Sequence, residues 1–163
     1  MIDNLEVITP SAEHSKELCD LLIESITVNC TADYNNDPQI MKEWLDNKTP
    51  INVAQWINSP NNISLAALDT FEGKFAGFVL MKKDGEILLN YVLPSHIYKG
   101  VGKVLLKGVE HIAKSSGIKT LSVISTITAK NFYERNGFVA SGEPEYVGAI
   151  LGDFPLIKHL NTV

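Results

Sequence analysis

Residues 88–103 read LLNYVLPSHIYKGVGK, and this stretch decides what the chain can fold into. It begins within a run at residues 87–93 that is apolar on nearly every position, which is typical of a central strand covered on both faces. After Pro94 comes a loop with glycines at Gly100 and Gly102, followed by an amphipathic helix. Glycines let backbone N–H groups approach a ligand, and the first turn of a helix adds unpaired donors. The stretch therefore predicts a loop that binds phosphate or pyrophosphate.

The segments after this loop predict a βαβ unit. The helix ends near Ser116-Gly117, and residues 120–125 form the next short strand. The expected apolar face of the helix consists of Val101, Val104, Leu105, Val109 and Ile112. A strand, loop, helix and strand within about 40 residues predict parallel strands at 87–93 and 120–125 with a right-handed crossover. Ligands of such units bind at the carboxyl ends of the strands, here beside the glycine loop.

Turn residues predict the remaining strands. Glu72-Gly73 and Asp84-Gly85 separate strand-like runs at residues 63–68, 75–81 and 87–93, which predicts an antiparallel meander. One further strand is expected near the N-terminus and two near the C-terminus. These are residues 5–8, residues 138–139 and residues 156–160.

Capping residues predict helices in the N-terminal third. Three helices are expected where a capping side chain precedes a proline, at Thr9-Pro10, Asp37-Pro38 and Thr49-Pro50. The first should bury a stripe of apolar residues, and Trp44 and Trp56 should anchor the next two. That stripe consists of Leu18, Leu21, Leu22 and Ile26. We therefore predict an α/β fold of the α+β kind: a mixed, mostly antiparallel sheet flanked by helices, with one parallel βαβ unit.

Composition limits the function. With 163 residues and 45% hydrophobic content, residues 1–163 are expected to form one domain with a substantial core. The 14 basic and 19 acidic residues give a net charge of −5, which argues against nucleic acid as a partner. The apolar runs are strand-sized and residues 1–4 show no leader pattern, so we expect no membrane association and a cytoplasmic location.

The two cysteines predict neither a disulfide nor a metal site. Cys19 and Cys30 fall in or just after one expected helix, where their spacing corresponds to roughly 16 Å. No cysteine or histidine stands at ligand spacing beside either residue. We expect buried or half-buried free thiols and no bound metal.

Spacing excludes two common phosphate-binding loops. A Walker loop fails because Ile97 stands where its first glycine should be and Val104 where its hydroxyl residue should be. A dinucleotide fingerprint fails because Leu105 stands where its last glycine should be, and no acidic residue follows at the required distance.

Two motifs instead resemble those of the GNAT superfamily of N-acetyltransferases. The family's acetyl-coenzyme A loop, Gln/Arg-x-x-Gly-x-Gly/Ala, is similar to residues 97–102, with Ile97 in the leading position. The preceding strand, close to Leu-Tyr-Val-x-Pro in the family, reads NYVLP at residues 90–94. A downstream motif, Asn-x-x-Ala-x-x-Phe-Tyr-x-x-x-Gly-Phe, resembles residues 126–138, with Thr126 replacing the asparagine. The resemblance implies a GNAT-like fold of the small, single-domain bacterial type.

The resemblance also implies a reaction, the transfer of an acetyl group from acetyl-coenzyme A to the amine of a small molecule. By family position Tyr133 would be the general acid that protonates the leaving thiolate, and a backbone N–H near Val92 would stabilise the oxyanion. Lys99 and Lys103 flank the glycines and are expected phosphate contacts. The full set of residues implied to bind the cofactor is Tyr91, Val92, Leu93, Tyr98, Lys99, Gly100, Val101, Gly102, Lys103, Ser125, Thr126, Ala129, Asn131 and Phe132.

The acceptor side is less defined. Tyr34, Asn90 and Tyr146 are candidate substrate-binding residues, whereas Trp44 is expected in the core. Glu86 lies roughly 17 Å along the strand from Tyr91, too far for a direct base, so a water relay is expected.

Several alternatives stay open. One is a non-catalytic sensor that binds acyl-coenzyme A; others are transfer to a protein or peptide amine, and transfer of a longer acyl group. A homodimer through residues 156–160 is also compatible with the pattern. His96 is expected to be a solvated loop histidine.

Overall fold

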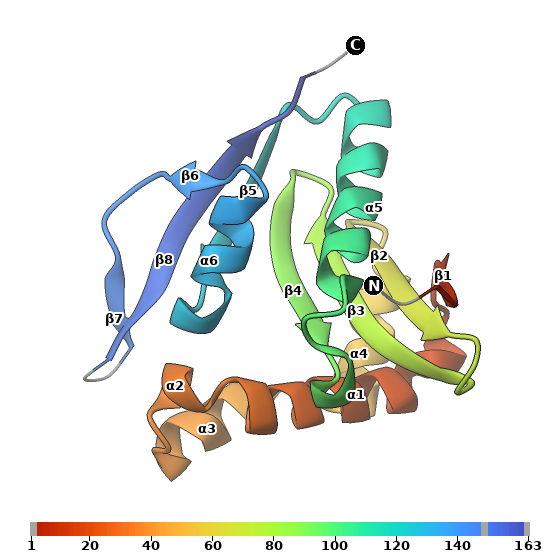
Figure 1. Ribbon diagram of the computed structural model, residues 1–163, viewed down its shortest axis with the longest axis horizontal. Coiled ribbons are helices and arrows are strands. Elements are labelled where there is room, and N and C mark those ends of the chain that lie inside the picture. Colours follow the sequence, from red (N-terminus) through yellow and green to blue (C-terminus); the bar gives the residue numbers. More distant parts are fainter. Residues whose placement is uncertain (1–2, 148–149, 162–163) are drawn as a thin grey trace.

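The computed structural model describes residues 3–147 and 150–161, which build a mixed sheet with helices on both faces (Figure 1). The strand order is β1-β2-β3-β4-β5-β8-β6, and β7 pairs with β8 beside this path. In chain order the elements are β1 (Leu5–Ile8), η1 (Ala12–His14), α1 (Ser15–Asn29), α2 (Thr31–Tyr34), α3 (Pro38–Leu45), α4 (Pro50–Asn58), β2 (Asn62–Asp69), β3 (Lys74–Lys82), β4 (Glu86–Val92), η2 (Pro94–His96), α5 (Val101–Ser115), β5 (Thr120–Ser125), α6 (Ile127–Arg135), β6 (Val139–Ala140), β7 (Glu145–Val147) and β8 (Ile150–His159). The predicted fold class is confirmed.

Strands β2 to β4 form the predicted antiparallel meander, and β1 pairs antiparallel with β2. Strand β4 then pairs in parallel with β5, at Glu86 with Ser122 and at Ile87 with Val123. Beyond these two pairs the strands diverge, and Figure 1 shows β4 standing apart from β5 and α6. The βαβ unit is therefore confirmed, and its parallel strands separate toward their carboxyl ends.

One prediction about β4 is wrong. The strand was expected to be covered on both faces, but the Leu88 side chain is 44% exposed. The cause is an irregularity in the β3–β4 ladder, where Leu80 pairs with Leu89 and Met81 pairs with Ile87, leaving Leu88 unmatched. The parallel ladder to β5 also stops before this residue, at Ile87.

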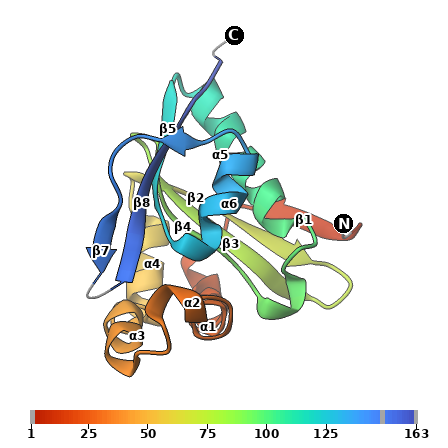
Figure 2. The same ribbon diagram turned by 60° about the vertical axis from the view of Figure 1, so that its left-hand side comes forward.

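The sheet separates two hydrophobic cores (Figure 2). Helices α5 and α6 cover one face, where Leu105 and Val109 pack against β-strand residues such as Val79. Helices α1 and α4 cover the other face, and the predicted apolar stripe of α1 is fully buried there. Trp44 and Trp56 are only partly buried and do not anchor a core. Trp56 packs at the edge of this second core, and Trp44 packs edge-to-face against Tyr34.

The helix starts are partly as predicted. Asp37 caps α3 by accepting hydrogen bonds from the N–H groups of Gln39 and Ile40, and Thr49 caps α4. The predicted start at Thr9-Pro10 is wrong. Ser11 flanks the first helical turn instead, because its N–H donates to Nδ1 of His14 at 3.0 Å, and α1 proper begins at Ser15.

Three further observations bear on the sequence analysis. Both cysteines are buried free thiols, as expected. Within residues 3–147 and 150–161, no helix is long and apolar enough to cross a bilayer. Met1 and Ile2, part of the segment searched for a leader pattern, lie outside the described residues.

Candidate active site

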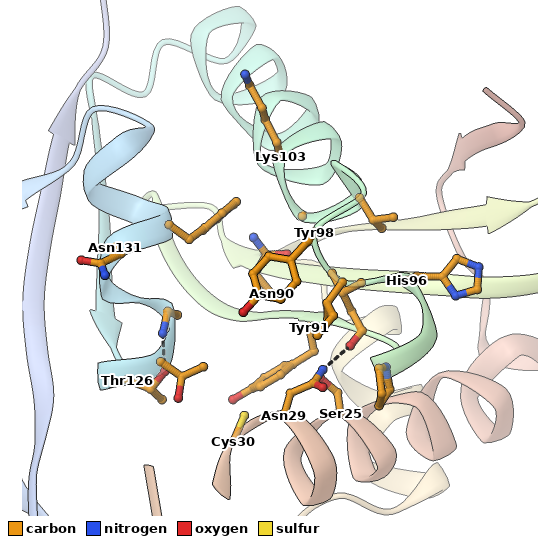
Figure 3. A pocket seen from close by; sticks show the side chains of 18 of the residues that line it. Ser25, Asn29, Cys30, Asn90, Tyr91, His96, Tyr98, Lys103, Thr126 and Asn131 are labelled. Atoms are coloured by element: carbon orange, nitrogen blue, oxygen red, sulfur yellow. Dashed lines mark hydrogen bonds between the residues drawn. The ribbon is translucent and has the colours of Figure 1, made fainter. Parts of the chain in front are cut away.

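A cleft of about 990 Å³ runs from the glycine loop into the gap between β4 and β5 (Figure 3). Its walls are the end of β4, the loop and first turn of α5, one face of α6, and the C-terminal end of α1. A smaller cavity of about 50 Å³ adjoins it behind Asn90, between β4, β5 and α6. The cleft therefore lies at the carboxyl ends of the two parallel strands, where the sequence placed it.

The glycine loop presents backbone groups to one end of this cleft. Gly100 has a φ of 86° and Tyr98 a φ of 61°, both in the left-handed region. Gly100 also begins α5 without any side chain capping the helix, so the N–H groups of the first turn are available to an anion. Lys103 on that turn lines the cleft. The predicted order of strand, glycine loop and helix is therefore present, and the start of α5 faces the cleft.

Helix α5 reaches the cleft because β3 lets it approach the sheet closely. A Cβ atom built at Gly77 would lie 2.8 Å from side-chain atoms of both Val101 and Leu105. A larger residue there would have to displace these two side chains or the helix that carries them. Gly77 therefore sets the height at which the first turn of α5 meets the end of β4.

At the other end of the cleft, the peptide groups of Val92 face the gap between the strands. The neighbouring Leu93 donates its N–H to Ala76 on β3 at 2.8 Å. Successive residues of a strand point their backbone groups to opposite sides, so the N–H and C=O of Val92 point toward β5. The Val92 carbonyl accepts a hydrogen bond from Asn29 of α1 at 3.0 Å (Figure 3). The Val92 N–H is thus oriented to serve as a donor inside the cleft.

Tyr133 lies in the wall of the smaller cavity. Its side chain is 4% exposed and packs edge-to-face against Phe132 and Phe138. Burial raises the pKa of Tyr133, while its contact with the Asn90 side chain acts in the opposite direction and lowers it. The phenol is therefore protonated at neutral pH, as a general acid must be before it acts.

The N-terminus of α6 forms the wall opposite the loop. Thr126 caps the helix by accepting a hydrogen bond from the N–H of Ala129 at 3.2 Å, and Asp33 of α2 accepts one from Thr128 at 2.9 Å. Thr126 therefore uses its hydroxyl on the helix itself. Ser125 is 2% exposed and donates to the Thr126 carbonyl, so it supports this turn from behind.

The structure brings most of the predicted cofactor residues to the cleft or the adjoining cavity, with two exceptions. Leu93 is buried in the core beneath α1, and Lys99 is exposed and absent from the cleft wall. Of the candidate acceptor residues, Asn90 lines both cavities. Tyr34 is 4% exposed and donates its hydroxyl to the Thr27 carbonyl, and Tyr146 is exposed on β7 outside the described cleft.

Sequence reasoning missed two groups in the cleft. Arg135 of α6 adds a second cation to its lining, and helical spacing from Thr128 and Phe132 could have identified it. The end of α1 contributes Asn29 and Cys30. Burial raises the pKa of the Cys30 thiol to about 12, so it is not a nucleophile at neutral pH. No local pattern in the sequence signals that α1 reaches β4.

The prediction for His96 is wrong. It was expected to be a solvated loop histidine, yet its side chain is 3% exposed and its Nε2 lies 2.9 Å from Oδ2 of Asp69. Glu72 brings a carboxylate oxygen to 3.7 Å from the same nitrogen. Among the described residues these three side chains form the one group that could hold a metal ion, with ligand atoms within 4.8 Å of one another.

This fold and cleft define an acyltransferase that uses a coenzyme A thioester. A family model described as an acetyltransferase (GNAT) domain matches residues 30–158, and the chain belongs to this family of N-acetyltransferases. No curated protein sequence matches the chain.

Solved structures share the fold. A GCN5-related N-acetyltransferase of Rhodopseudomonas palustris superposes with a TM-score of 0.80 at 24% identity, covering 96% of this chain and 94% of that chain. The PaiA N-acetyltransferase of Thermoplasma acidophilum, in complex with coenzyme A, gives 0.79 at 22% identity, covering 96% and 99%. A putative streptothricin acetyltransferase of Bacillus anthracis, in complex with acetyl-coenzyme A, gives 0.57 at 26% identity, covering 66% and 67%.

The residues of the cleft fit coenzyme A. The left-handed Gly100 and the uncapped start of α5 suit a pyrophosphate, with Lys103 and Arg135 as nearby cations. The backbone of Val92 in the gap offers hydrogen-bonding groups to an amide-containing arm. The cleft is also long enough to connect these two sites, since the same cavity contacts both.

Proposed function

We propose that this protein transfers an acetyl group from acetyl-coenzyme A to the primary amine of a small molecule, and that residues 1–163 act as one acetyltransferase domain. The observation that carries the proposal is the divergence of β4 from β5. It leaves the Val92 N–H facing the cleft, while the buried phenol of Tyr133 lines the adjoining cavity that shares Asn90 and Tyr91 with the cleft. A donor for a developing negative charge and a protonated acid are what transfer from a thioester requires.

Each group has a separate task. When bound, acetyl-coenzyme A supplies a thioester whose carbonyl carbon the amine attacks. Gly100, Gly102 and Lys103 hold the pyrophosphate, and the Val92 N–H donates to the carbonyl oxygen as it becomes negative. Tyr133 gives its proton from Oη to the sulfur that leaves. The amine loses a proton to water as the amide forms, and the same water relay returns a proton to the Tyr133 phenolate. Asn90 orients the acceptor from the wall that the two cavities share.

Two features support a slender acceptor group. The cavity beside Tyr133 measures about 50 Å³, which suits an amino group and adjoining methylenes. The hydrogen bonds from Asn29 to Val92 and from Thr128 to Asp33 fasten α1 and α2 across the end of the gap. One similar structure is named for streptothricin, which agrees with a small-molecule acceptor.

Binding and turnover are tested in sequence. Coenzyme A at millimolar concentration should raise the melting temperature, and an unchanged melting temperature would refute the binding site. Thiol release is then followed over a panel of small amines and lysine peptides, with wild type and Tyr133→Phe. Release on small amines that depends on Tyr133 supports the enzyme. Tight binding without release on any amine would identify the sensor instead, and faster release on peptides would identify a protein acceptor.

A further inference from the structure

His96 and Asp69 form a buried pair next to the glycine loop, and the proposed reaction uses neither of them. The two side chains are 4% and 6% exposed, and Nε2 of His96 lies 2.9 Å from Oδ2 of Asp69. Asp69 ends β2, whereas His96 ends η2 and directly precedes Ile97. The pair therefore connects the start of the glycine loop to the end of β2, which lies two strands from β4 in the sheet and 27 residues away in the sequence.

Asp69 is a fixed anchor. Its Oδ1 accepts hydrogen bonds from the Asn4 side chain and from the backbone N–H groups of Phe71 and Glu72, at 3.0 to 3.1 Å. The hydrogen bonds from His96 and Glu72 lower the pKa of Asp69, so the carboxylate is ionised at neutral pH. An ionised carboxylate can only accept hydrogen bonds. Nε2 of His96 therefore carries a proton and donates the hydrogen bond to Asp69. Nδ1 of the same ring contacts the Ser95 hydroxyl at 2.7 Å.

The loop itself offers little else to hold its shape. Tyr98 has a φ of 61°, a conformation that non-glycine residues rarely adopt, and its side chain is 96% exposed. Packing of that side chain cannot be what keeps the backbone in place. At its far end the loop is held by the hydrogen bond from Val104 N–H to the Gly100 carbonyl. At its near end it is held by His96, through the backbone bond to Leu93 and the side-chain bond to Asp69.

We propose that His96 is a positioning residue for pyrophosphate binding: its bond to Asp69 holds residues 97–100 in the conformation that presents their N–H groups to the ligand. The inference rests on the proposed function, since it requires coenzyme A in this cleft. Figure 3 shows the His96 ring directed away from the centre of the cleft, while its backbone forms part of the rim. The residue therefore acts through the loop and does not touch the ligand.

Two amide substitutions of different length separate this role from general stability. His96→Gln places an N–H donor near the position of Nε2, whereas His96→Asn carries the same amide one methylene shorter and does not reach Asp69. Each is assayed with acetyl-coenzyme A and with S-acetylpantetheine, which lacks the pyrophosphate. With acetyl-coenzyme A, we expect kcat/KM of His96→Asn to fall about tenfold because KM rises. With S-acetylpantetheine, kcat/KM should change less than twofold. His96→Gln should restore wild-type values within about threefold.

The control breaks a different pair. Lys158 on β8 contacts Glu110 on α5 at 2.8 Å, partly buried and remote from the loop. Lys158→Met should lower the melting temperature without any change in KM for acetyl-coenzyme A.

Three results would overturn the inference. The first is an equal fall in kcat/KM of His96→Asn with acetyl-coenzyme A and with S-acetylpantetheine. The second is an unchanged KM of His96→Asn for acetyl-coenzyme A. The third is a His96→Asn chain that no longer folds, which would show that the pair stabilises the fold as a whole. If wild type itself fails to bind coenzyme A, the proposed function fails as well. If wild type binds and His96→Asn binds equally well, only this inference fails.

Discussion

The two ends of the cleft are built in different ways. At the glycine loop the ligand-facing groups are backbone N–H groups, and the neighbouring Tyr98 side chain is 96% exposed. At the split between β4 and β5 the proposed general acid is a buried side chain, since Tyr133 is 4% exposed among aromatic rings. This difference predicts which substitutions each end of the cleft tolerates. The loop should tolerate changes of side chain that keep its backbone shape, whereas the split should tolerate none that removes a proton or a donor.

Tyr133→Phe should have the largest effect. Removal of the hydroxyl takes away the acid at the buried end while keeping the ring that packs against Phe138. We expect kcat to fall about 100-fold, with less than a twofold change in the dissociation constant of coenzyme A. Steady-state thiol release and calorimetry measure the two quantities. A kcat that falls less than threefold would show that another group supplies the proton.

The same substitution changes stability at high pH. Because burial raises the pKa of Tyr133, the folded protein keeps a proton that the unfolded chain loses above about pH 10. The stabilisation is complete below that pH and declines above it, by about 1.4 kcal/mol of unfolding free energy per pH unit for this one group. Urea unfolding of wild type and Tyr133→Phe at pH 9 and 11 measures the difference. Parallel curves for the two proteins would mean that the phenol is not buried in solution.

The buried end of the cleft shows which features can be predicted from the sequence and which cannot. The βαβ unit and the caps at Asp37 and Thr49 were predictable because apolar spacing and capping chemistry are local. The contact of Asn29 with Val92 was not, because 63 residues separate the two and neither belongs to a distinctive motif. The burial of His96 was hidden for the same reason. A lone histidine after a proline is typical of a loop, and its partner is the last residue of a distant strand.

Tyr34 illustrates a different failure. An aromatic residue near a helix end was a reasonable acceptor contact, but its hydroxyl bonds to the Thr27 carbonyl of the preceding helix. That interaction depends on the break at Cys30 between α1 and α2. Helix propensity predicts that both helices form, but it does not predict the angle between them. The same limit applies to the overall shape of the acceptor side, which tertiary packing decides.

Gly100→Ala tests the loop end and should have an intermediate effect. Gly100 has a φ of 86°, so a methyl group there disfavours the conformation that directs the N–H groups into the cleft. We expect the dissociation constant of coenzyme A to rise about fivefold to tenfold, with kcat at saturating donor nearly unchanged. Gly117→Ala is the matched control, since Gly117 has a φ of 78° and open space around it, at the other end of α5. A similar loss of affinity in both variants would point to general destabilisation.

Ile97→Arg should have the smallest effect, and it decides how complete the contrast between the two ends is. Ile97 occupies the position where related loops carry glutamine or arginine, and it lines the cleft. If backbone N–H groups and the start of α5 do the binding, an added guanidinium contributes only an exposed charge contact. We therefore expect the dissociation constant of coenzyme A to change less than twofold at 0.15 M salt, by calorimetry. Ile97→Gln serves as the uncharged control. A tenfold tightening confined to arginine would show that a side-chain cation limits affinity at the loop.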